Sequence, residues 1–258
     1  INTITEIESR VYADRATHLG DPDFFNVPQK SLLDKEYLLN RFSEIESSIK
    51  TPSSEVKEGS FNGIESEETT HFSIVDKYGN AVSVTTTING GYGSKVVVEG
   101  AGFLLNNEMD DFSVKPGYPN MFGLVGGEAN SIEPNKRMLS SMTPTIIEKN
   151  DKLFMVVGTP GGSTIITSVF QTILNVIDYG MGMQEAVDSK KFHHQWLPDV
   201  LAVEENTLSE KLSNDLTQIG HKIVKRKTLG RMDCILIMED GSLEGGADKR
   251  GDNVALGY

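Results

Sequence analysis

The segment 67–89 opens with Glu67-Glu68-Thr69-Thr70-His71-Phe72-Ser73-Ile74-Val75-Asp76 and, after a short turn, continues from Ala81 to Asn89. The two strand-like runs predict a β-hairpin with the hydroxyl of Thr69 at the head of the first strand. If the chain is cut after Glu68, Thr69 gains a free α-amine, which can act as the base for its own hydroxyl. The Glu68–Thr69 bond is therefore a candidate cleavage site, and Thr69 is a candidate nucleophile.

A Thr-Thr pair alone is normally just the polar start of a strand, so this hypothesis needs support from elsewhere in the chain. The run Thr85-Thr86-Thr87 ends the neighbouring predicted strand and could place a second hydroxyl beside Thr69. Gly161 and Gly162 precede a predicted helix, where backbone N–H groups and the helix dipole can form an oxyanion hole. The run 106–111, Asn-Asn-Glu-Met-Asp-Asp, gathers acceptors suited to an ammonium group.

Each of these features also has an ordinary structural explanation. Gly-Gly before a helix is usually a tight turn, and the run 158–163 lacks the Gly-Lys-Ser/Thr ending of a phosphate-binding loop. Asp110-Asp111 is more often a solvated turn, and Ser140-Ser141 is more often polar filler before a strand. No His, Cys or carboxylate group has zinc spacing, so no metal site is predicted.

Composition excludes several classes of function. The chain has 258 residues, 38% of them hydrophobic and 24% charged, which is typical of a soluble globular protein. Its formal charge of -13 argues against nucleic acid as a partner. No apolar run approaches the roughly 20 residues of a membrane span. No signal peptide is expected, because Ile1 opens a polar stretch.

The charge distribution suggests a boundary at the candidate cleavage site. Residues 1–68 carry 14 acidic and 7 basic side chains, whereas residues 69–258 carry 23 and 17. Residues 51–68 are rich in Ser, Pro, Gly and Glu, and they predict an exposed, mobile segment that is open to cleavage. Cys234 is the only cysteine and lies in an apolar run, so we expect a buried structural thiol.

Sheets and helices alternate with long loops in the rest of the chain. Residues 1–30 are predicted as loop, and a helix capped by Ser31 is predicted to run to about Ser47. Gly117 to Asn130 forms a long loop of the kind that often acts as a lid. Strands are predicted at 72–76, 81–87, 145–148, 153–157, 222–225 and 234–239, and helices from near Ser163 to Gly180, at 184–191 and at 209–219. Hairpins with segregated helices indicate an α+β fold, with sheets flanked by helices.

From Thr69 to Tyr258 the chain closely resembles the small subunit of γ-glutamyltransferase, an N-terminal nucleophile hydrolase. Six ordered strings carry this resemblance: Thr69 to Ser73, Leu104 to Ser113, Gly123 to Gly127, Leu139 to Met142, Pro160 to Ser163, and Phe192 to Pro198. Residues 11–60 resemble the tail of the large subunit through Ala13-Asp14-Arg15, Gly20 to Phe24, and Pro52 to Glu55. The resemblance divides the chain into a large-subunit tail, 1–68, and a small-subunit catalytic domain, 69–258.

The resemblance implies a fold and a set of roles. The fold would be a four-layer αββα sandwich, two stacked mainly antiparallel sheets between helices, incomplete without the large subunit. Thr69 would be the nucleophile, released by self-cleavage after Glu68, and Thr87 would orient it. The implied oxyanion hole is Gly161 and Gly162; the implied ligands of the donor's α-amino end are Asn89, Glu108 and Asp111; those of its α-carboxylate are Ser140 and Ser141.

The implied reaction needs no cofactor. Its donor would be glutathione or another γ-glutamyl compound, its acceptor an amino acid, a peptide or water, and its partner the large subunit of the same precursor. Bacterial members of the family are periplasmic or secreted. Two departures stand out: the family's donor-binding arginine belongs to the large subunit, and Phe122 stands where bacterial members often carry a lid tyrosine.

Two alternatives remain open at this point. One is an uncleaved, inactive fragment that dimerises or binds a partner through apolar surfaces left uncovered by the missing large subunit. The other is a relative that acts on poly-γ-glutamate or a glutaryl cephalosporin. The residues implied to bind a free amino-acid end favour a γ-glutamyl donor over this second alternative.

Overall fold

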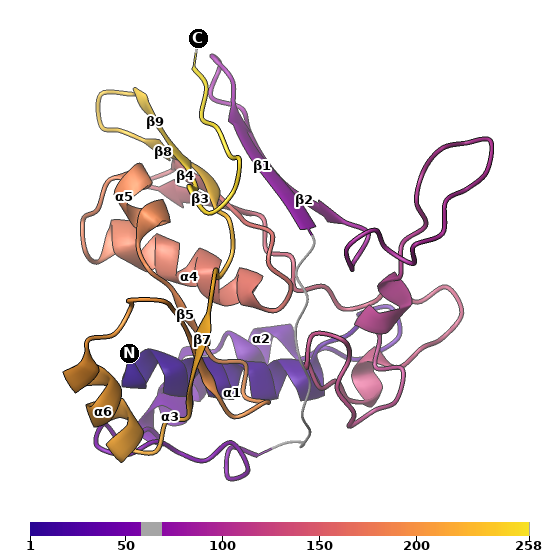
Figure 1. Ribbon diagram of the computed structural model, residues 1–258, viewed down its shortest axis with the longest axis vertical. Helices are drawn as coiled ribbons and strands as arrows, with labels where there is room; N and C mark the ends of the chain where they lie inside the picture. The colour runs from indigo at the N-terminus through magenta and orange to yellow at the C-terminus, as the bar shows by residue number, and fades with distance from the viewer. Residues whose placement is uncertain (58–68, 258) are drawn as a thin grey trace. The chain divides into compact units, whose positions relative to one another are not determined.

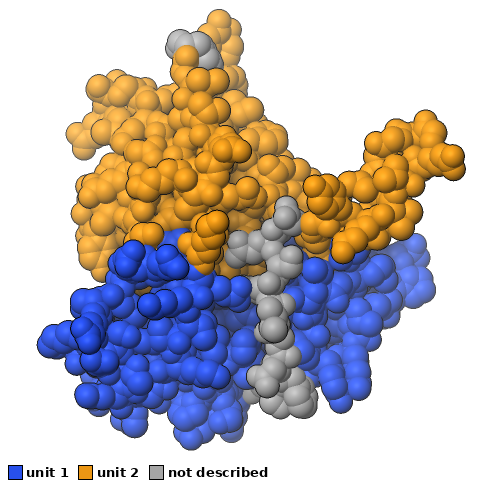
Figure 2. All heavy atoms as spheres, viewed as in Figure 1, with its two compact units in different colours: residues 1–66, 107–140, 193–226 blue, residues 67–106, 141–192, 227–258 orange. Residues whose placement is uncertain are grey.

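The computed structural model of the chain describes residues 1–57 and 69–257. It contains two compact units, each built from three separate stretches of sequence (Figure 2). Unit 1 comprises residues 1–66, 107–140 and 193–226, and unit 2 comprises residues 67–106, 141–192 and 227–258. Glu68, on the upstream side of the candidate cleavage site, lies outside the described residues.

Unit 1 combines helices with a small sheet. Its helices are α1 (Asn2–His18), α2 (Gln29–Leu32), α3 (Lys35–Ser43) and α6 (Glu210–Gln218), with 3-10 turns η1 (Glu108–Asp111) and η2 (Glu128–Asn130). The sheet has the order β5 (Phe192–His193), β6 (Leu201–Glu204), β7 (Ile223–Arg226), and β6 and β7 are parallel. The ring of Tyr12 from α1 meets the ring of His193 edge-on, with 5.9 Å between centroids.

The loop predicted for residues 1–30 is wrong over its first half, because α1 occupies Asn2–His18. The helix escaped detection because much of the face it buries is polar rather than apolar. Arg10 forms an ion pair with Glu6 at 2.8 Å, and Glu6 also accepts from the N–H of Thr51 at 3.0 Å. The N–H of His194 donates to Glu8 at 2.9 Å. Periodicity of apolar residues cannot reveal a helix that buries charged side chains against partners elsewhere in the chain.

The single helix predicted from Ser31 to about Ser47 is in fact two, α2 and α3. Ser31 does not cap it: the N-cap of α3 is Asp34, whose side chain accepts from the N–H of Tyr37 at 3.0 Å. Capping by Asp34 holds the chain in an extended conformation at that residue and breaks the helix there.

Part of the segment predicted to be exposed is buried. Trp196, which is 2% exposed, donates from Nε1 to the carbonyls of Ser53 at 3.0 Å and Val56 at 3.1 Å. Ser53 and Val56 are themselves buried. Residues 58–68 of the predicted mobile segment lie outside the described residues.

Unit 2 contains an antiparallel hairpin, β1 (Thr69–Val75) and β2 (Ala81–Thr87), as the sequence predicts. A four-stranded antiparallel sheet has the order β3 (Thr145–Lys149), β4 (Lys152–Val157), β8 (Asp233–Ile237), β9 (Leu243–Ala247). The hairpin contacts this sheet, with Ser73 Oγ donating to the carbonyl of Asp233 at 2.8 Å. The helices α4 (Thr164–Ile177) and α5 (Met183–Asp188) lie beside the sheet (Figure 1).

The core of unit 2 lies between these helices and the sheet. Gly246 of β9 is needed here, because a Cβ atom would lie 2.8 Å from a methyl group of Val187 and 2.9 Å from Met183 Cγ. The buried residues of this core are Met155, Val157, Ile165, Val169, Val176, Met183, Ala186, Val187, Met232, Cys234 and Leu236. The mixture of helices with mainly antiparallel sheets confirms the α+β class. β6 and β9 were not predicted, because β6 is buried throughout and β9 contains Gly245 and Gly246.

Cys234 is buried, and burial raises the pKa of its thiol to about 12. Because the thiolate is the reactive form, we expect less than about 0.1% of the folded protein to be labelled at pH 8 in the time that an exposed cysteine needs to react. Iodoacetamide labelling followed by mass spectrometry should show no adduct on the folded protein and one adduct in guanidinium. Rapid labelling of the folded protein would contradict this burial.

Candidate active site

The predicted nucleophile stands opposite its predicted partner at the open end of the hairpin. Thr69 pairs with Thr87 across the two strands, and Thr69 Oγ1 donates to Thr87 Oγ1 at 3.4 Å. The N–H of Asn89 donates to the same Thr87 oxygen at 2.9 Å. Thr87 is therefore held by the chain that follows it, and it fixes the side of the strand on which the Thr69 hydroxyl lies.

Asn89 marks the point where the chain leaves β2. It is 3% exposed and has a φ of 73°, in the left-handed region that asparagine tolerates better than most residues. This conformation folds its N–H back towards Thr87. The structure thus brings three predicted site residues, Thr69, Thr87 and Asn89, to one end of the hairpin.

His71, two residues after Thr69 in β1, links the two strands of the hairpin. Its Nδ1 lies 2.8 Å from Thr85 Oγ1, and its Nε2 lies 3.1 Å from Ser73 Oγ. Burial lowers the pKa of His71 to about 4, so the ring is neutral at neutral pH. His71 links the two strands, and it also lies against the loop that carries the predicted oxyanion hole, since a Cβ atom on Gly158 would lie 2.1 Å from its ring.

Gly161 and Gly162 have φ values of 142° and 54°, which favour glycine. The carbonyl of Gly161 accepts from the N–H of Thr164 at 3.0 Å, in the first turn of α4. Because the C=O and N–H of a trans peptide point in opposite directions, the N–H of Gly162 points away from that turn. This orientation is the one an oxyanion donor at a helix N-terminus requires.

Arg231, which sequence reasoning missed, connects Thr69, the predicted nucleophile, with the glycine loop. Its N–H donates to Thr159 Oγ1 at 2.7 Å, and its Nη2 lies 3.5 Å from the carbonyl oxygen of Thr69. The preceding Gly230 lies against Gly161, since a Cβ atom on Gly161 would be 3.4 Å from its Cα. Arg231 carries no motif signal in the sequence, and only the folded chain brings it to this position.

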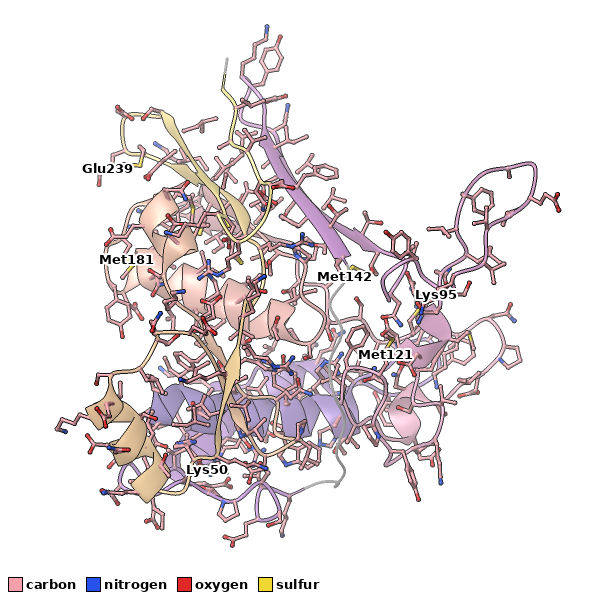
Figure 3. All side chains as sticks on the ribbon, viewed as in Figure 1. Lys50, Lys95, Met121, Met142, Met181 and Glu239 are labelled. Atoms are coloured by element: carbon pink, nitrogen blue, oxygen red, sulfur yellow. The ribbon has the colours of Figure 1, made fainter. Side chains whose placement is uncertain are left out.

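Glu108 and Asp111 share the single turn η1 in unit 1. The pKa of Asp111 is raised to about 6, chiefly by burial and also by the nearby charge of Glu108, while the charge of Arg15 acts to lower it. Burial also raises the pKa of Glu108. Two carboxyl groups with raised pKa values and one nearby guanidinium make a site that a positively charged ligand would stabilise. Next to them, the N–H of Met121 donates to Asp110 at 2.8 Å (Figure 3).

The remaining predicted residues lie in irregular segments. Ser140 is exposed and belongs to unit 1, whereas Ser141 is half-buried and belongs to unit 2. Phe122 is 5% exposed; its N–H donates to Asn120 at 2.9 Å, and its carbonyl accepts from Gln195 at 3.1 Å. The lid role of this loop stays a prediction.

Metal-binding clusters and membrane-spanning helices are both missing from the part of the chain that the structure describes. Over 1–57 and 69–257, no group of three or more His, Cys, Asp or Glu side chains is arranged to hold a metal ion. Within the same residues, no helix has the length and apolar character needed to cross a membrane.

Known proteins match the chain over its full length. The family model described as Gamma-glutamyltranspeptidase matches residues 1–258. The glutathione hydrolase proenzyme of Escherichia coli strain K12 is 47% identical over 256 residues, which are 99% of this chain and 44% of that protein. An acylase ACY 1 proenzyme of Pseudomonas sp. strain SE83 is 34% identical, over 99% of this chain and 43% of that protein.

A solved structure of Helicobacter pylori gamma-glutamyltranspeptidase, the T380A mutant, aligns with a TM-score of 0.68 and 55% identity, over 70% of this chain and all of that one. The fold is that of the N-terminal nucleophile hydrolases. The chain belongs to the γ-glutamyltranspeptidase family. It spans less than half the length of the E. coli relative.

Proposed function

We propose that the protein containing this chain transfers or hydrolyses γ-glutamyl groups through an ester on Thr69, after cleavage of the Glu68–Thr69 bond. The observation that carries this proposal is the pairing of Thr69 Oγ1 with Thr87 Oγ1 at the head of β1. Family membership supports it, and the E. coli relative is named a glutathione hydrolase proenzyme.

Cleavage would use the same hydroxyl as turnover. Thr69 Oγ attacks the carbonyl carbon of Glu68, the C–N bond breaks, and the nitrogen becomes the free amine of Thr69. Water then hydrolyses the resulting ester and leaves a carboxylate on Glu68. The new α-amine has a reference pKa of roughly 7.7–8.0, so part of it is neutral near pH 7 and can accept a proton.

In turnover, Thr69 Oγ attacks the γ-carbonyl carbon of the donor while the α-amine accepts the hydroxyl proton. That proton passes to the leaving nitrogen as the amide bond breaks, and a γ-glutamyl ester remains on Thr69. Water or the amine of an amino acid or peptide then attacks the ester. We assign the oxyanion to the N–H groups of Gly161 and Gly162, whose loss would typically reduce the rate on the order of 10²- to 10³-fold.

The proposed ligands divide the donor's amino-acid end between two groups of residues. Asn89, Glu108 and Asp111 would bind the α-ammonium group. Ser140 and Ser141 would bind the α-carboxylate. The raised pKa values of the two carboxyl groups support the first assignment, because a bound ammonium would offset the cost of burying their charges.

This assignment predicts a pH dependence. The pKa of Asp111 is raised to about 6, so its carboxylate is present above that pH and is lost as the pH falls through it. We expect the KM for glutathione to rise about tenfold per pH unit below 6. Steady-state kinetics from pH 5 to 8 would measure this rise, and Asp111→Asn should flatten it. A KM that stays constant in the parent protein would contradict the role of Asp111.

We also propose that residues 1–68 are the tail of a large subunit, that residues 69–258 are the small-subunit catalytic domain, and that the two products remain partners. By resemblance to bacterial members, the compartment would be periplasmic or extracellular. The intact mass of the denatured complete precursor tests the cleavage. Two fragments that meet at Glu68 and Thr69 support it, and a single uncleaved mass favours the inactive-precursor alternative.

A second candidate function is the hydrolysis of glutaryl amides, which is favoured by the 34% identity to an acylase proenzyme. Donor titration separates the two candidates. We expect kcat/KM for glutathione to exceed that for a matched glutaryl amide, which lacks the α-amine, by on the order of 10²-fold or more. Equal values would favour the acylase.

A further inference from the structure

Asn130 is a buried side chain that joins two of the proposed ligand segments. It lies at the end of η2 and is 4% exposed. Its Nδ2 donates to the backbone carbonyl of Asp111 at 2.8 Å, and its Oδ1 accepts from the N–H of Leu139 at 3.0 Å. One amide therefore spans the backbone of a proposed ammonium ligand and the residue directly before Ser140, a proposed carboxylate ligand.

The backbone of Asn130 strengthens the same connection. Its carbonyl accepts from the N–H of Ser113 at 2.9 Å, two residues after Asp111. Asn130 thus holds the end of η1 by two hydrogen bonds and the approach to Ser140 by a third. An amide side chain suits this position best, because it can donate from its nitrogen and accept at its oxygen at the same time.

The turn that carries Asn130 is itself anchored by the end of α1 and the loop that follows it. The N–H of Gly127 donates to the carbonyl of Ala16 at 2.8 Å. Gly20 lies so close to η2 that a Cβ atom on it would be 2.1 Å from the carbonyl oxygen of Ala129. Asn130 therefore has little freedom to follow either ligand segment if one of them shifts.

The segment before Ser140 has a second support. Asp21, which is 4% exposed, accepts from the backbone N–H of Arg137 at 2.8 Å and from its guanidinium Nε at 3.0 Å. Asp21 holds residue 137 and Asn130 holds residue 139, so the chain reaches Ser140 in a defined conformation. Asp21 touches only the carboxylate side, whereas Asn130 touches both sides.

We propose that Asn130 is a positioning residue that fixes the distance between the ammonium and carboxylate ligands, and so selects donors with a free α-amino-acid end. This inference rests on the proposed γ-glutamyl function. Asn130 does not touch the donor. It acts through Asp111 and Ser140, and its removal lets the two halves of the donor site move apart.

Two substitutions separate the two ends of the amide. Asn130→Asp at pH 8 keeps an acceptor for the Leu139 N–H but places a negative oxygen against the Asp111 carbonyl. Asn130→Ala removes both contacts. Asn175→Asp is the matched control, because Asn175 is half-buried in α4 and its amide makes a long contact of 3.5 Å with the carbonyl of Ala186.

The kinetics of each variant are measured in the complete precursor with three donors: glutathione, a glutaryl amide without the α-amine, and a 4-aminobutyryl amide without the α-carboxylate. For Asn130→Asp we expect the preference for glutathione over the glutaryl amide to fall about tenfold, while the preference over the 4-aminobutyryl amide is kept. For Asn130→Ala we expect both preferences to fall. The losses should lie in KM, with kcat per titrated active site nearly unchanged.

A purely structural role would give a different pattern. If Asn130 only stabilises the fold, both variants lower the fraction of active protein, and the donor preferences stay at the parent values; that result overturns the inference. If Asn130→Asp is too unstable to purify, Asn130→Ala still tests the inference, because its preferences for glutathione over each of the other two donors can be measured. A parent protein that does not use glutathione overturns the proposed function, and the inference falls with it.

Discussion

Thr69→Ala should leave the complete precursor as a single polypeptide and should reduce glutathione turnover by on the order of 10⁴-fold or more. In the proposed mechanism both losses have one cause, because the same hydroxyl oxygen attacks the carbonyl of Glu68 in the precursor and the γ-carbonyl of the donor in the mature protein. We do not expect Thr87 to replace it, because Thr87 stands on the neighbouring strand and does not follow the bond to be cut. Denaturing mass spectrometry measures the loss of cleavage, and glutamate release from glutathione measures the loss of turnover.

Thr70→Ala is the matched control, because Thr70 is the adjacent residue and its side chain is exposed. In β1 successive side chains point to opposite faces, so the Thr70 hydroxyl cannot occupy the place of Thr69. We expect this variant to be cleaved and to turn over glutathione within about threefold of the parent protein. If the Thr69→Ala precursor is cleaved between residues 69 and 70, or if it keeps a turnover that the Thr70 change abolishes, the nucleophile would be Thr70. Continued cleavage after Glu68 would contradict the role of Thr69.

The hairpin of unit 2 and the strands β3, β4 and β8 of its sheet were predictable because their signals are local. Alternating side chains define β1 and β2, and the turns at Lys77–Asn80 and Asn150–Asp151 separate the strands of each hairpin. The helix α4 was predictable from its continuous apolar surface. By contrast, α1 has no such signal, because its buried Glu6, Glu8 and Arg10 depend on partners more than 30 residues away as well as on each other.

The candidate site shows the same division. The predicted hairpin brings Thr69 near the run Thr85 to Thr87, and the register that pairs it with Thr87 comes from the structure. The contacts that hold the site depend on segments far apart in the chain: Arg231 lies 162 residues from Thr69, and Asp21 lies 116 residues from Arg137. Asn130 was visible only as the last residue of a predicted lid, since neither of its partners is a neighbour in sequence. A single sequence does not show which of its distant residues form such pairs.

The approach of Gly158 to His71 gives the second large prediction. Gly158→Ala should destabilise the protein by about 3 kcal/mol and should slow cleavage of the precursor at least about tenfold. Its Cβ atom would lie 2.1 Å from His71 Cε1 and 2.5 Å from Nδ1, far inside van der Waals contact. The ring cannot move away, because Thr85 and Ser73 hold both of its nitrogens. The strain must then pass either into β1, which carries Thr69, or into the loop that carries Gly161 and Gly162.

A double-mutant cycle identifies the ring as the cause. His71→Ala alone loses buried hydrogen bonds and should be destabilising, but it also opens the space that the new methyl group needs. The double variant His71→Ala/Gly158→Ala should therefore lose less stability than the two single changes added together, by at least about 1 kcal/mol. Gly257→Ala is the control for a glycine without neighbours, since no atom lies within 4 Å of its Cβ position. Thermal unfolding and the intact-mass time course measure both effects. Additive losses of stability in the cycle would mean that Gly158 is needed for some reason other than its contact with His71. The contact between β1 and the glycine loop would then have to depend on Arg231 alone.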